Sequence, residues 1–135
     1  MVDTAWAGLA ASEMGLGPVY ASTPLLQRNN LTLDDIDYWE INEAFAGQVL
    51  ACLKAWENDA FCQNELGLEK ALGTLDQNKL NLDGGAIAIG HPVGATGARL
   101  SLHALKHLER TNKKLAIATL CIGGGLGGAM LLERV

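Results

Sequence analysis

Hydrophobic positions recur along this chain with two periods, and each period predicts a different kind of element. Residues 38–42 mix aromatic and β-branched side chains, which is typical of a short strand. Directly afterwards, apolar side chains recur at intervals of four, three and four residues at Phe45, Val49, Cys52 and Trp56. That spacing places all of them on one side of a helix, so the sequence predicts a helix with one buried face.

The last third of the chain predicts a helix followed by two strands. Residues 95–110 show a helical period, with apolar side chains near one face at Ala98, Leu102, Leu105 and Leu108. Residues 115–120 are nearly all apolar, as in a strand covered on both faces, and residues 129–132 predict a second strand. Because strands alternate with helices, we expect an α/β domain of three layers, with a mixed sheet covered by helices on both faces.

The remaining segments have weaker patterns. Residues 1–18 show no sustained period and are expected to be an irregular connector. A serine, a threonine and a proline at positions 22–24 predict a helix start, and this helix should end near residue 30, before a turn over 31–37. Residues 57–81 are polar and form an excursion with room for one short helix.

Composition narrows the class of protein. With 135 residues, 49% hydrophobic and 19% charged, the chain is expected to form one domain, residues 1–135, with a real core. No apolar run approaches the roughly 18 residues of a membrane span, and no leader pattern opens the chain, so a cytoplasmic protein is expected.

Charge and cysteine spacing limit the partners. A net charge of −5 with only ten Lys and Arg argues against nucleic acid as a partner. Cysteines at 52, 62 and 121 lack metal-site and disulfide spacings, so free thiols and no metal are expected.

Two glycine-rich runs, residues 84–99 and 121–128, carry the strongest candidates for chemistry, His91 and Cys121. Glycine lets main-chain N–H groups approach a ligand closely, so each run can form a bend around its reactive side chain. His91 follows the apolar run 86–89 and is expected where a buried strand ends, a place where open α/β sheets bind ligands. A lone histidine is more often structural, but here an imidazole could take a proton or donate to an oxyanion.

Cys121 differs from the other cysteines because it leads directly into glycines. The N–H of Gly123 and its neighbours could surround a carbonyl oxygen and form an oxyanion hole. Cys52 lies on the apolar helical stripe and is expected to be an unreactive packing residue. Cys62 lies in the polar excursion and is expected to be incidental to the chemistry. Asn42 stands at a strand-to-helix junction, where it could cap the helix, anchor a water or substrate carbonyl, or do both.

Nucleotide-binding motifs are excluded by their context. Residues 123–128 fit the pattern G-x-G-x-x-G after a strand, but only seven residues follow Gly128. That leaves no room for the phosphate-facing helix or for the acidic residue some 20 positions on. No Gly-Lys-Ser or Gly-Lys-Thr of a phosphate loop occurs.

Ordered motifs over nearly the whole chain resemble the carboxyl-terminal domain of the thiolases, the acetyl-CoA acetyltransferases and 3-ketoacyl-CoA thiolases. They are Asn42-Glu43-Ala44-Phe45, Gly90-His91-Pro92 with Gly94 and Gly97, and Cys121-Ile122-Gly123-Gly124-Gly125, opened by Met14-Gly15-Leu16-Gly17-Pro18. Three ordered motifs are far more specific than any one of them. The long polar excursion resembles an acetyl-CoA acetyltransferase subgroup.

The resemblance implies acyl transfer to or from CoA, by Claisen condensation or by thiolysis of a 3-ketoacyl-CoA through an acyl-cysteine. Coenzyme A and acyl-CoA would be substrates, and no cofactor would be bound covalently. His91 would activate the nucleophilic thiol and line one oxyanion site, where Asn42 would hold a water. Cys121 would be the acid/base at the α-carbon or at the CoA sulfur.

The resemblance also implies that the N–H of Gly123 serves a second oxyanion site, and that Ala44 and Phe45 touch the pantetheine arm. The nucleophile itself is missing, because neither Cys52 nor Cys62 lies in a Cys-x-Ser-Gly-type turn. We therefore expect that an amino-terminal thiolase half carries it, that the full-length protein is a homo-oligomer, and that this chain alone catalyses no thiolysis.

Two other functions compete with this one. A non-catalytic thiolase-like domain could bind acyl chains or act as an assembly partner, and an upstream half without the Cys-x-Ser-Gly turn would favour it. A decarboxylative condensing enzyme would pair a cysteine with two histidines. It is disfavoured because Cys121 stands in the last glycine motif, and because His103 and His107 lie on a predicted helix with no glycine bend.

Overall fold

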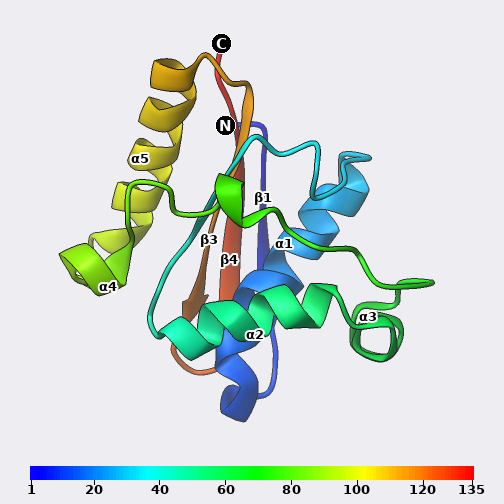
Figure 1. Cartoon of the computed structure of the whole chain (residues 1–135). Helices are drawn as coiled ribbons and strands as arrows, with labels where there is room; N and C mark the ends of the chain where they lie inside the picture. The colour runs from blue at the N-terminus through cyan, green and yellow to red at the C-terminus, as the bar shows by residue number, and fades with distance from the viewer.

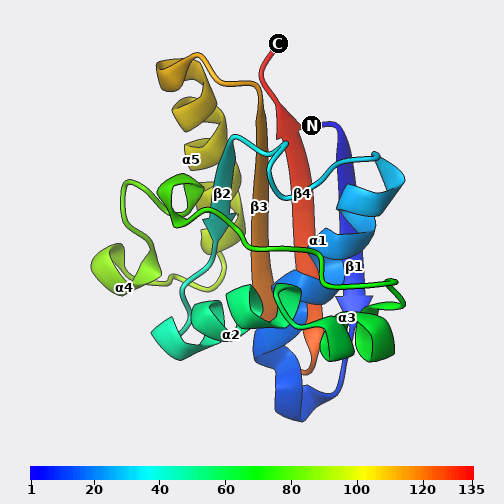
Figure 2. The same ribbon diagram turned by 45° about the vertical axis from the view of Figure 1, so that its right-hand side comes forward.

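A four-stranded mixed sheet forms the centre of the computed structural model, which describes all residues from 1 to 135. The strands are β1 (Asp3–Gly8), β2 (Tyr38–Ile41), β3 (Leu115–Ile122) and β4 (Leu126–Glu133). Figure 2 shows them side by side in the order β1-β4-β3-β2. Strands β2 and β3 are parallel, whereas β4 is antiparallel to both of its neighbours, so the expected mixed sheet is confirmed.

Helices lie on both sides of this sheet, which gives the three expected layers (Figure 1). The helices are α1 (Gly17–Arg28), α2 (Ala46–Trp56), α3 (Asp59–Leu66), α4 (Ala86–Ile89) and α5 (Thr96–Thr111), with 3-10 turns η1 (Ala11–Leu16) and η2 (Gln77–Lys79). Helices α1 and α2 share one core with the sheet, and α5 packs against the opposite face. None of these helices combines the length and the apolar character that crossing a membrane requires.

Strand β3 is apolar along its length because both of its faces are buried. Ile117 belongs to the core under α1 and α2, while Ala116 and Ala118 pack against α5. In the larger core, Trp39 and Trp56 are fully buried with ring centroids 5.4 Å apart. The Trp56 indole N–H donates to the Thr23 hydroxyl at 3.2 Å, so its polar atom is also satisfied.

The expected connector over residues 1–18 is wrong. Strand β1 occupies residues 3–8 and pairs with β4, and α1 begins at Gly17 instead of near Ser22. As an edge strand, β1 buries only Ala5 and leaves Trp6 76% exposed, so its sequence lacks a clear period. Pro18 is the first-turn proline of α1, and Pro24 lies inside the helix on an exposed position.

The apolar run before His91 is helix α4, not the expected buried strand. Ile87 and Ile89 are 64% and 61% exposed, so their apolar character does not reflect burial within this chain. Gly90 ends the helix at φ +92°, a backbone conformation that other residues rarely adopt. The histidine therefore follows a short helix and a glycine bend.

Of the four apolar residues expected near one face of α5, only Leu108 is buried. The buried apolar side chains are Leu100, Ala104 and Leu108, whereas Leu102 is 61% exposed. Helix α5 thus carries a second apolar stripe that this chain does not cover. In α2, the predicted stripe holds for Val49, Cys52 and Trp56, but Phe45 precedes the helix and is 68% exposed.

Candidate functional site

Two parallel strands bring candidate residues together at their carboxyl ends, which form one edge of the sheet. Strands β2 and β3 are parallel, so their carboxyl ends lie together, and Asn42 comes directly after β2. The backbone N–H of Asn42 donates to the Thr119 carbonyl at 2.9 Å, two residues before Cys121 near the end of β3. This edge is the place where open α/β sheets bind ligands.

Asn42 and His91 meet at this edge although 49 positions separate them. The Asn42 side chain is fully buried, and its amide nitrogen lies 3.4 Å from His91 Nε2. The Asn42 amide oxygen is buried without a hydrogen-bond partner, which is uncommon for a polar atom in a folded protein. The alternative role of Asn42 as a helix cap is not found, because Phe45 is the N-cap residue of α2.

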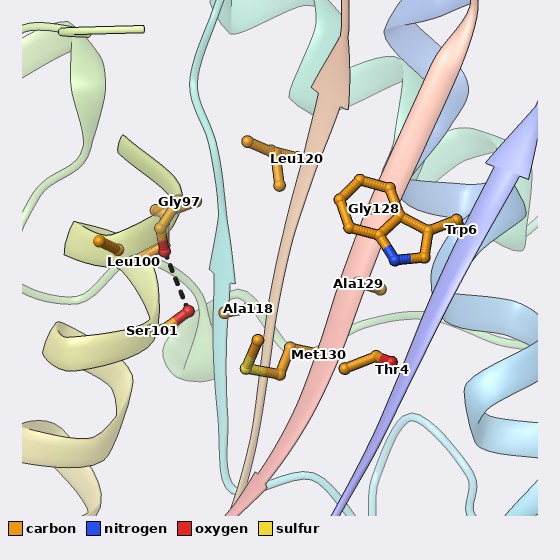
Figure 3. A pocket seen from close by; sticks show the side chains of 11 residues that line it. Thr4, Trp6, Gly97, Leu100, Ser101, Ala118, Leu120, Gly128, Ala129 and Met130 are labelled. Atoms are coloured by element: carbon orange, nitrogen blue, oxygen red, sulfur yellow. Dashed lines mark hydrogen bonds between the residues drawn. The ribbon is translucent and has the colours of Figure 1, made fainter. Parts of the chain in front are cut away.

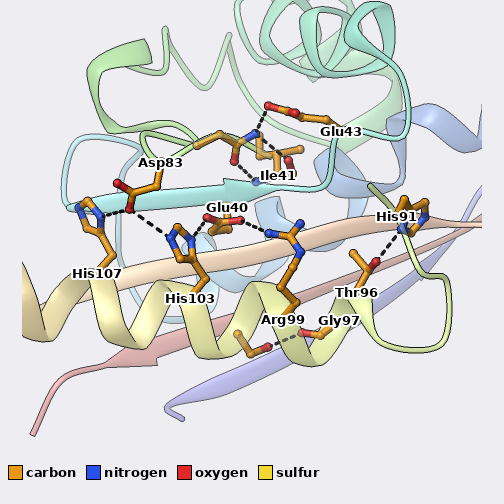
Figure 4. Close-up of polar contacts among 12 residues, drawn as sticks. Glu40, Ile41, Glu43, Asp83, His91, Thr96, Gly97, Arg99, His103 and His107 are labelled. Carbon is orange, nitrogen blue, oxygen red and sulfur yellow. Dashed lines mark hydrogen bonds and ion pairs between the residues drawn. The ribbon is translucent and has the colours of Figure 1, made fainter. Parts of the chain in front are cut away.

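Thr96, at the start of α5, determines which ring nitrogen of His91 carries the proton. Its hydroxyl donates to the Pro92 carbonyl at 3.1 Å and lies 2.7 Å from His91 Nδ1 (Figure 4). Because a hydroxyl has a single proton, it must accept from Nδ1–H. His91 Nε2 therefore presents its lone pair toward Asn42, and the imidazole is set up as a base.

Replacing Thr96 with valine should remove the preference of His91 for the tautomer with a proton on Nδ1. Valine matches the shape of threonine but offers no acceptor to Nδ1–H, so we expect a mixture of both neutral tautomers in place of one. The ¹⁵N chemical shifts of the His91 imidazole measure this directly. Thr96→Ser keeps the hydroxyl and should retain the native shifts; a serine variant that behaves like the valine variant would contradict the assignment.

Cys121 lies in a protected position near the end of β3. It is 8% exposed, and burial raises the pKa of its thiol, so the group is neutral at pH 7. Its partner in the β3–β4 ladder is Gly127, and the backbone of Gly17 packs beside both. No hydrogen bond joins Cys121 to Asn42 or His91; what they share is the sheet edge.

Cys52 is a buried packing residue, as expected, and Cys62 is buried as well. Burial raises the pKa of Cys52 to about 12, and its thiol donates to the Gly15 carbonyl at 3.3 Å. Cys62 is fully buried, and its thiol donates to the Ala55 carbonyl at 3.4 Å. Neither thiol is placed to react.

The remaining candidate residues lie in exposed connections next to the same strands. Gly123 is exposed in the turn between β3 and β4, where Gly124 and Gly125 adopt φ values of +88° and +86°. Ala44 and Phe45 lie in the connection from β2 to α2, two and three residues after Asn42. Their proposed contacts with a ligand stay predictions.

His103 and His107 belong to a separate polar cluster between α5 and β2 (Figure 4). His103 contacts the buried Glu40 carboxylate through Nδ1 and Asp83 through Nε2 at 3.1 Å. The His107 ring stacks on Tyr38 with centroids 3.8 Å apart. These contacts hold α5 against β2, so the two histidines have structural partners away from the Asn42–His91 pair.

The sequence did not indicate three residues that support the site. Thr96 orients His91, while Asn81 and Glu43 hydrogen bond around the end of β2. A threonine between Gly94 and Gly97, at the start of the predicted helical period, was the available signal for Thr96. Glu43 stands inside a motif, but nothing in the pattern marks Asn81.

Comparison with known proteins gives one consistent family. The family model described as "Thiolase, C-terminal domain" matches residues 1–134. The chain is 46% identical over 121 residues to a 3-ketoacyl-CoA thiolase of Vibrio cholerae and 47% identical to one of Pectobacterium atrosepticum. Each alignment covers 90% of this chain but 28% of the relative. The chain therefore spans just over a quarter of the length of these curated relatives.

A solved structure supports the fold independently. The crystal structure of the Bacillus anthracis acetyl-CoA acetyltransferase superposes with a TM-score of 0.79 at 36% sequence identity. The superposition covers 98% of this chain and 29% of that chain.

Proposed function

Because the chain belongs to the thiolase family, as its carboxyl-terminal domain, we propose that it supplies one half of an active site that transfers acyl groups to and from coenzyme A. The reaction is Claisen condensation of two acyl-CoA molecules or, in reverse, thiolysis of a 3-ketoacyl-CoA. The curated relatives that carry the name 3-ketoacyl-CoA thiolase support this proposal. Coenzyme A and its thioesters are substrates.

The Asn42–His91 pair is the observation that carries the proposal. His91 Nε2 carries a lone pair and no proton, so it can take the proton of the nucleophilic thiol; once protonated, the same nitrogen donates to an oxyanion. The buried Asn42 amide oxygen can accept from a water that lies between it and the substrate oxygen. One imidazole thus serves two successive steps without changing its position.

Cys121 is proposed as the acid/base at the α-carbon or at the CoA sulfur. Its raised pKa supports this role, since a thiol that is neutral at pH 7 has a proton to give. The exposed N–H of Gly123 serves a second oxyanion site, and Ala44 and Phe45 contact the pantetheine arm. The 68% exposure of Phe45 is consistent with a surface that a ligand covers.

The nucleophile is proposed to come from an amino-terminal thiolase half. An uncovered apolar surface beside α5 supports its docking there: a groove of about 260 Å³ whose walls include Trp6, Leu120 and Met130 (Figure 3). Ala98 of α5 lines this groove, and the exposed Leu102 follows it one helical turn later. An exposed apolar patch of this kind is typical of an interface. We propose that residues 1–135 form one domain of such a protein, which is a homo-oligomer in the cytoplasm, where its free thiols stay reduced.

The test compares this chain with the parent protein, that is, the chain extended upstream in its own reading frame. We expect CoA-dependent loss of acetoacetyl-CoA absorbance with the parent protein, and no rate above the uncatalysed one with the 135-residue chain, which has no Cys-x-Ser-Gly turn. An inactive parent protein that still binds acyl-CoA would support the alternative, a non-catalytic acyl-binding or assembly domain. Thiolysis by the chain alone would mean that the nucleophile is misassigned.

A further inference from the structure

A loop segment continues the sheet beyond the free edge of β2. Leu80 forms a parallel bridge with Trp39, and the Asn81 N–H donates to the Trp39 carbonyl at 2.9 Å. Asn81 adopts φ +46°, a left-handed conformation that asparagine tolerates better than most residues. The chain therefore turns away at Asn81 while its side chain still faces the strand.

The Asn81 side chain takes the place of the backbone groups that would otherwise hydrogen bond to Ile41, the next residue of β2 on this side. Its amide oxygen accepts from the Ile41 N–H at 3.0 Å, and its amide nitrogen donates to the Ile41 carbonyl at 2.9 Å. Both backbone groups of an edge-strand residue are thereby satisfied by one side chain. Since Ile41 immediately precedes Asn42, this contact fixes the backbone from which the Asn42 side chain projects.

Glu43 connects the same amide to the segment that carries His91. One carboxylate oxygen accepts from Asn81 Nδ2 at 2.9 Å, and the other accepts from the Ile87 N–H, in the first turn of α4, at 3.1 Å. The carboxylate packs against Gly85, where any Cβ would overlap it. Helix α4 ends at the glycine before His91, so Glu43 holds that helix beside β2.

We propose that Asn81 and Glu43 are positioning residues that hold Asn42 and His91 at their working distance; this proposal rests on the proposed function. One hydrogen-bonded chain, here called the clamp, runs from the Ile41 backbone through Asn81 and Glu43 to the Ile87 N–H. One end directly precedes Asn42, and the other lies in the helix α4 that leads to His91. The clamp acts through Asn42 and His91 and touches no substrate.

Glu43→Gln tests the clamp in the parent protein with little change in shape. A carboxamide has one acceptor oxygen in place of two, so either Asn81 or the Ile87 N–H loses its partner. We expect kcat for acetoacetyl-CoA thiolysis to fall about tenfold and KM to stay within about twofold, because the pair moves while the substrate contacts remain. Glu69→Gln is the matched control, since Glu69 is exposed and its carboxylate has no partner. It should leave kcat unchanged.

Exchanging the carboxamide and the carboxylate between positions 81 and 43 distinguishes an effect on the position of the pair from a loss of folding. Asn81→Asp alone places a carboxylate beside Glu43 and the Ile41 carbonyl, and should lower kcat at least as much as Glu43→Gln. The double variant Asn81→Asp with Glu43→Gln reverses donor and acceptor between positions 81 and 43, and lets the glutamine oxygen accept from Ile87. We expect it to recover several-fold of the kcat lost in Asn81→Asp. Absence of any recovery would overturn the clamp.

Hydrogen exchange supplies a readout that does not need activity. Mass spectrometry of the segment 85–92 should show faster exchange in Glu43→Gln than in Glu69→Gln, with the thermal midpoints of both close to the wild type. Unchanged exchange and unchanged kcat would overturn the proposal. If the wild-type parent protein has no thiolase activity, the proposed function fails, while the exchange of this segment still decides whether the clamp exists.

Discussion

We expect the replacement of Cys121 by alanine in the parent protein to lower kcat for thiolysis of acetoacetyl-CoA by about 10³-fold, because a general acid/base contributes roughly 10²–10⁴ to a rate. The thiol is nearly enclosed, and its raised pKa keeps it protonated at neutral pH. In the proposed role, this thiol exchanges a proton with the α-carbon or the CoA sulfur, so its loss should leave a bound substrate without that group. Steady-state rates with KM for both substrates measure the effect, and KM should change little.

Cys52→Ala is the matched control for this experiment. Cys52 is also a buried cysteine, fully enclosed, with its thiol donating to the Gly15 carbonyl, so its loss reports only on packing. We expect lower stability and a kcat within about threefold of the wild type. If Cys121→Ala retained most of the activity, or if Cys52→Ala removed it, the assignment of the acid/base would be wrong.

The parts of the fold that sequence patterns predicted are those whose environment lies within this chain. Strand β3 has neighbours on both faces, so its unbroken apolar run over 115–120 was sufficient. Strand β1 could not be predicted, because it is recognisable only from its pairing with β4 more than 100 residues later. Likewise, Leu102 on α5 and Ile87 on α4 are apolar but exposed, so a helical period and an apolar run assigned them to buried positions that this chain does not provide.

In the candidate site, too, the sequence indicated some residues and missed others. Glycine-rich motifs indicated His91 and Cys121 as candidates, and the strand-to-helix junction indicated Asn42, because reactive side chains in bends stand out in a sequence. The Asn81 side chain hydrogen bonds to Ile41 and Glu43, which only the folded chain brings near, and the Thr96 hydroxyl contacts the ring of His91. No spacing rule connects Asn81 with Ile41 across 40 positions. Orientation of a site is therefore harder to predict than its chemistry.

Gly127→Ala should be the most destabilising change near Cys121, because the backbone of α1 contacts the backbone of the inner strand β4 there without any side chain between them. A Cβ on Gly127 would overlap the Gly17 carbonyl and lie 2.7 Å from the Gly17 Cα. Backbone atoms of a helix and a strand cannot move aside as a side chain can. We expect a loss of about 3 kcal/mol in the free energy of unfolding, at the upper end of overpacking effects, measured by urea denaturation of the 135-residue chain.

Gly8→Ala provides the control with the opposite sign. Gly8 also lies in a strand, paired with Leu126 at the edge of the sheet, but a Cβ there would meet no atom within 4 Å. Alanine restricts the unfolded chain more than glycine does, so this variant should be as stable as the wild type or more stable by up to about 1 kcal/mol. Equal stabilities of the two variants would show that α1 does not pack on β4 at Gly127. Because Gly127 is the ladder partner of Cys121, that outcome would also remove the structural reason for the position of the proposed acid/base.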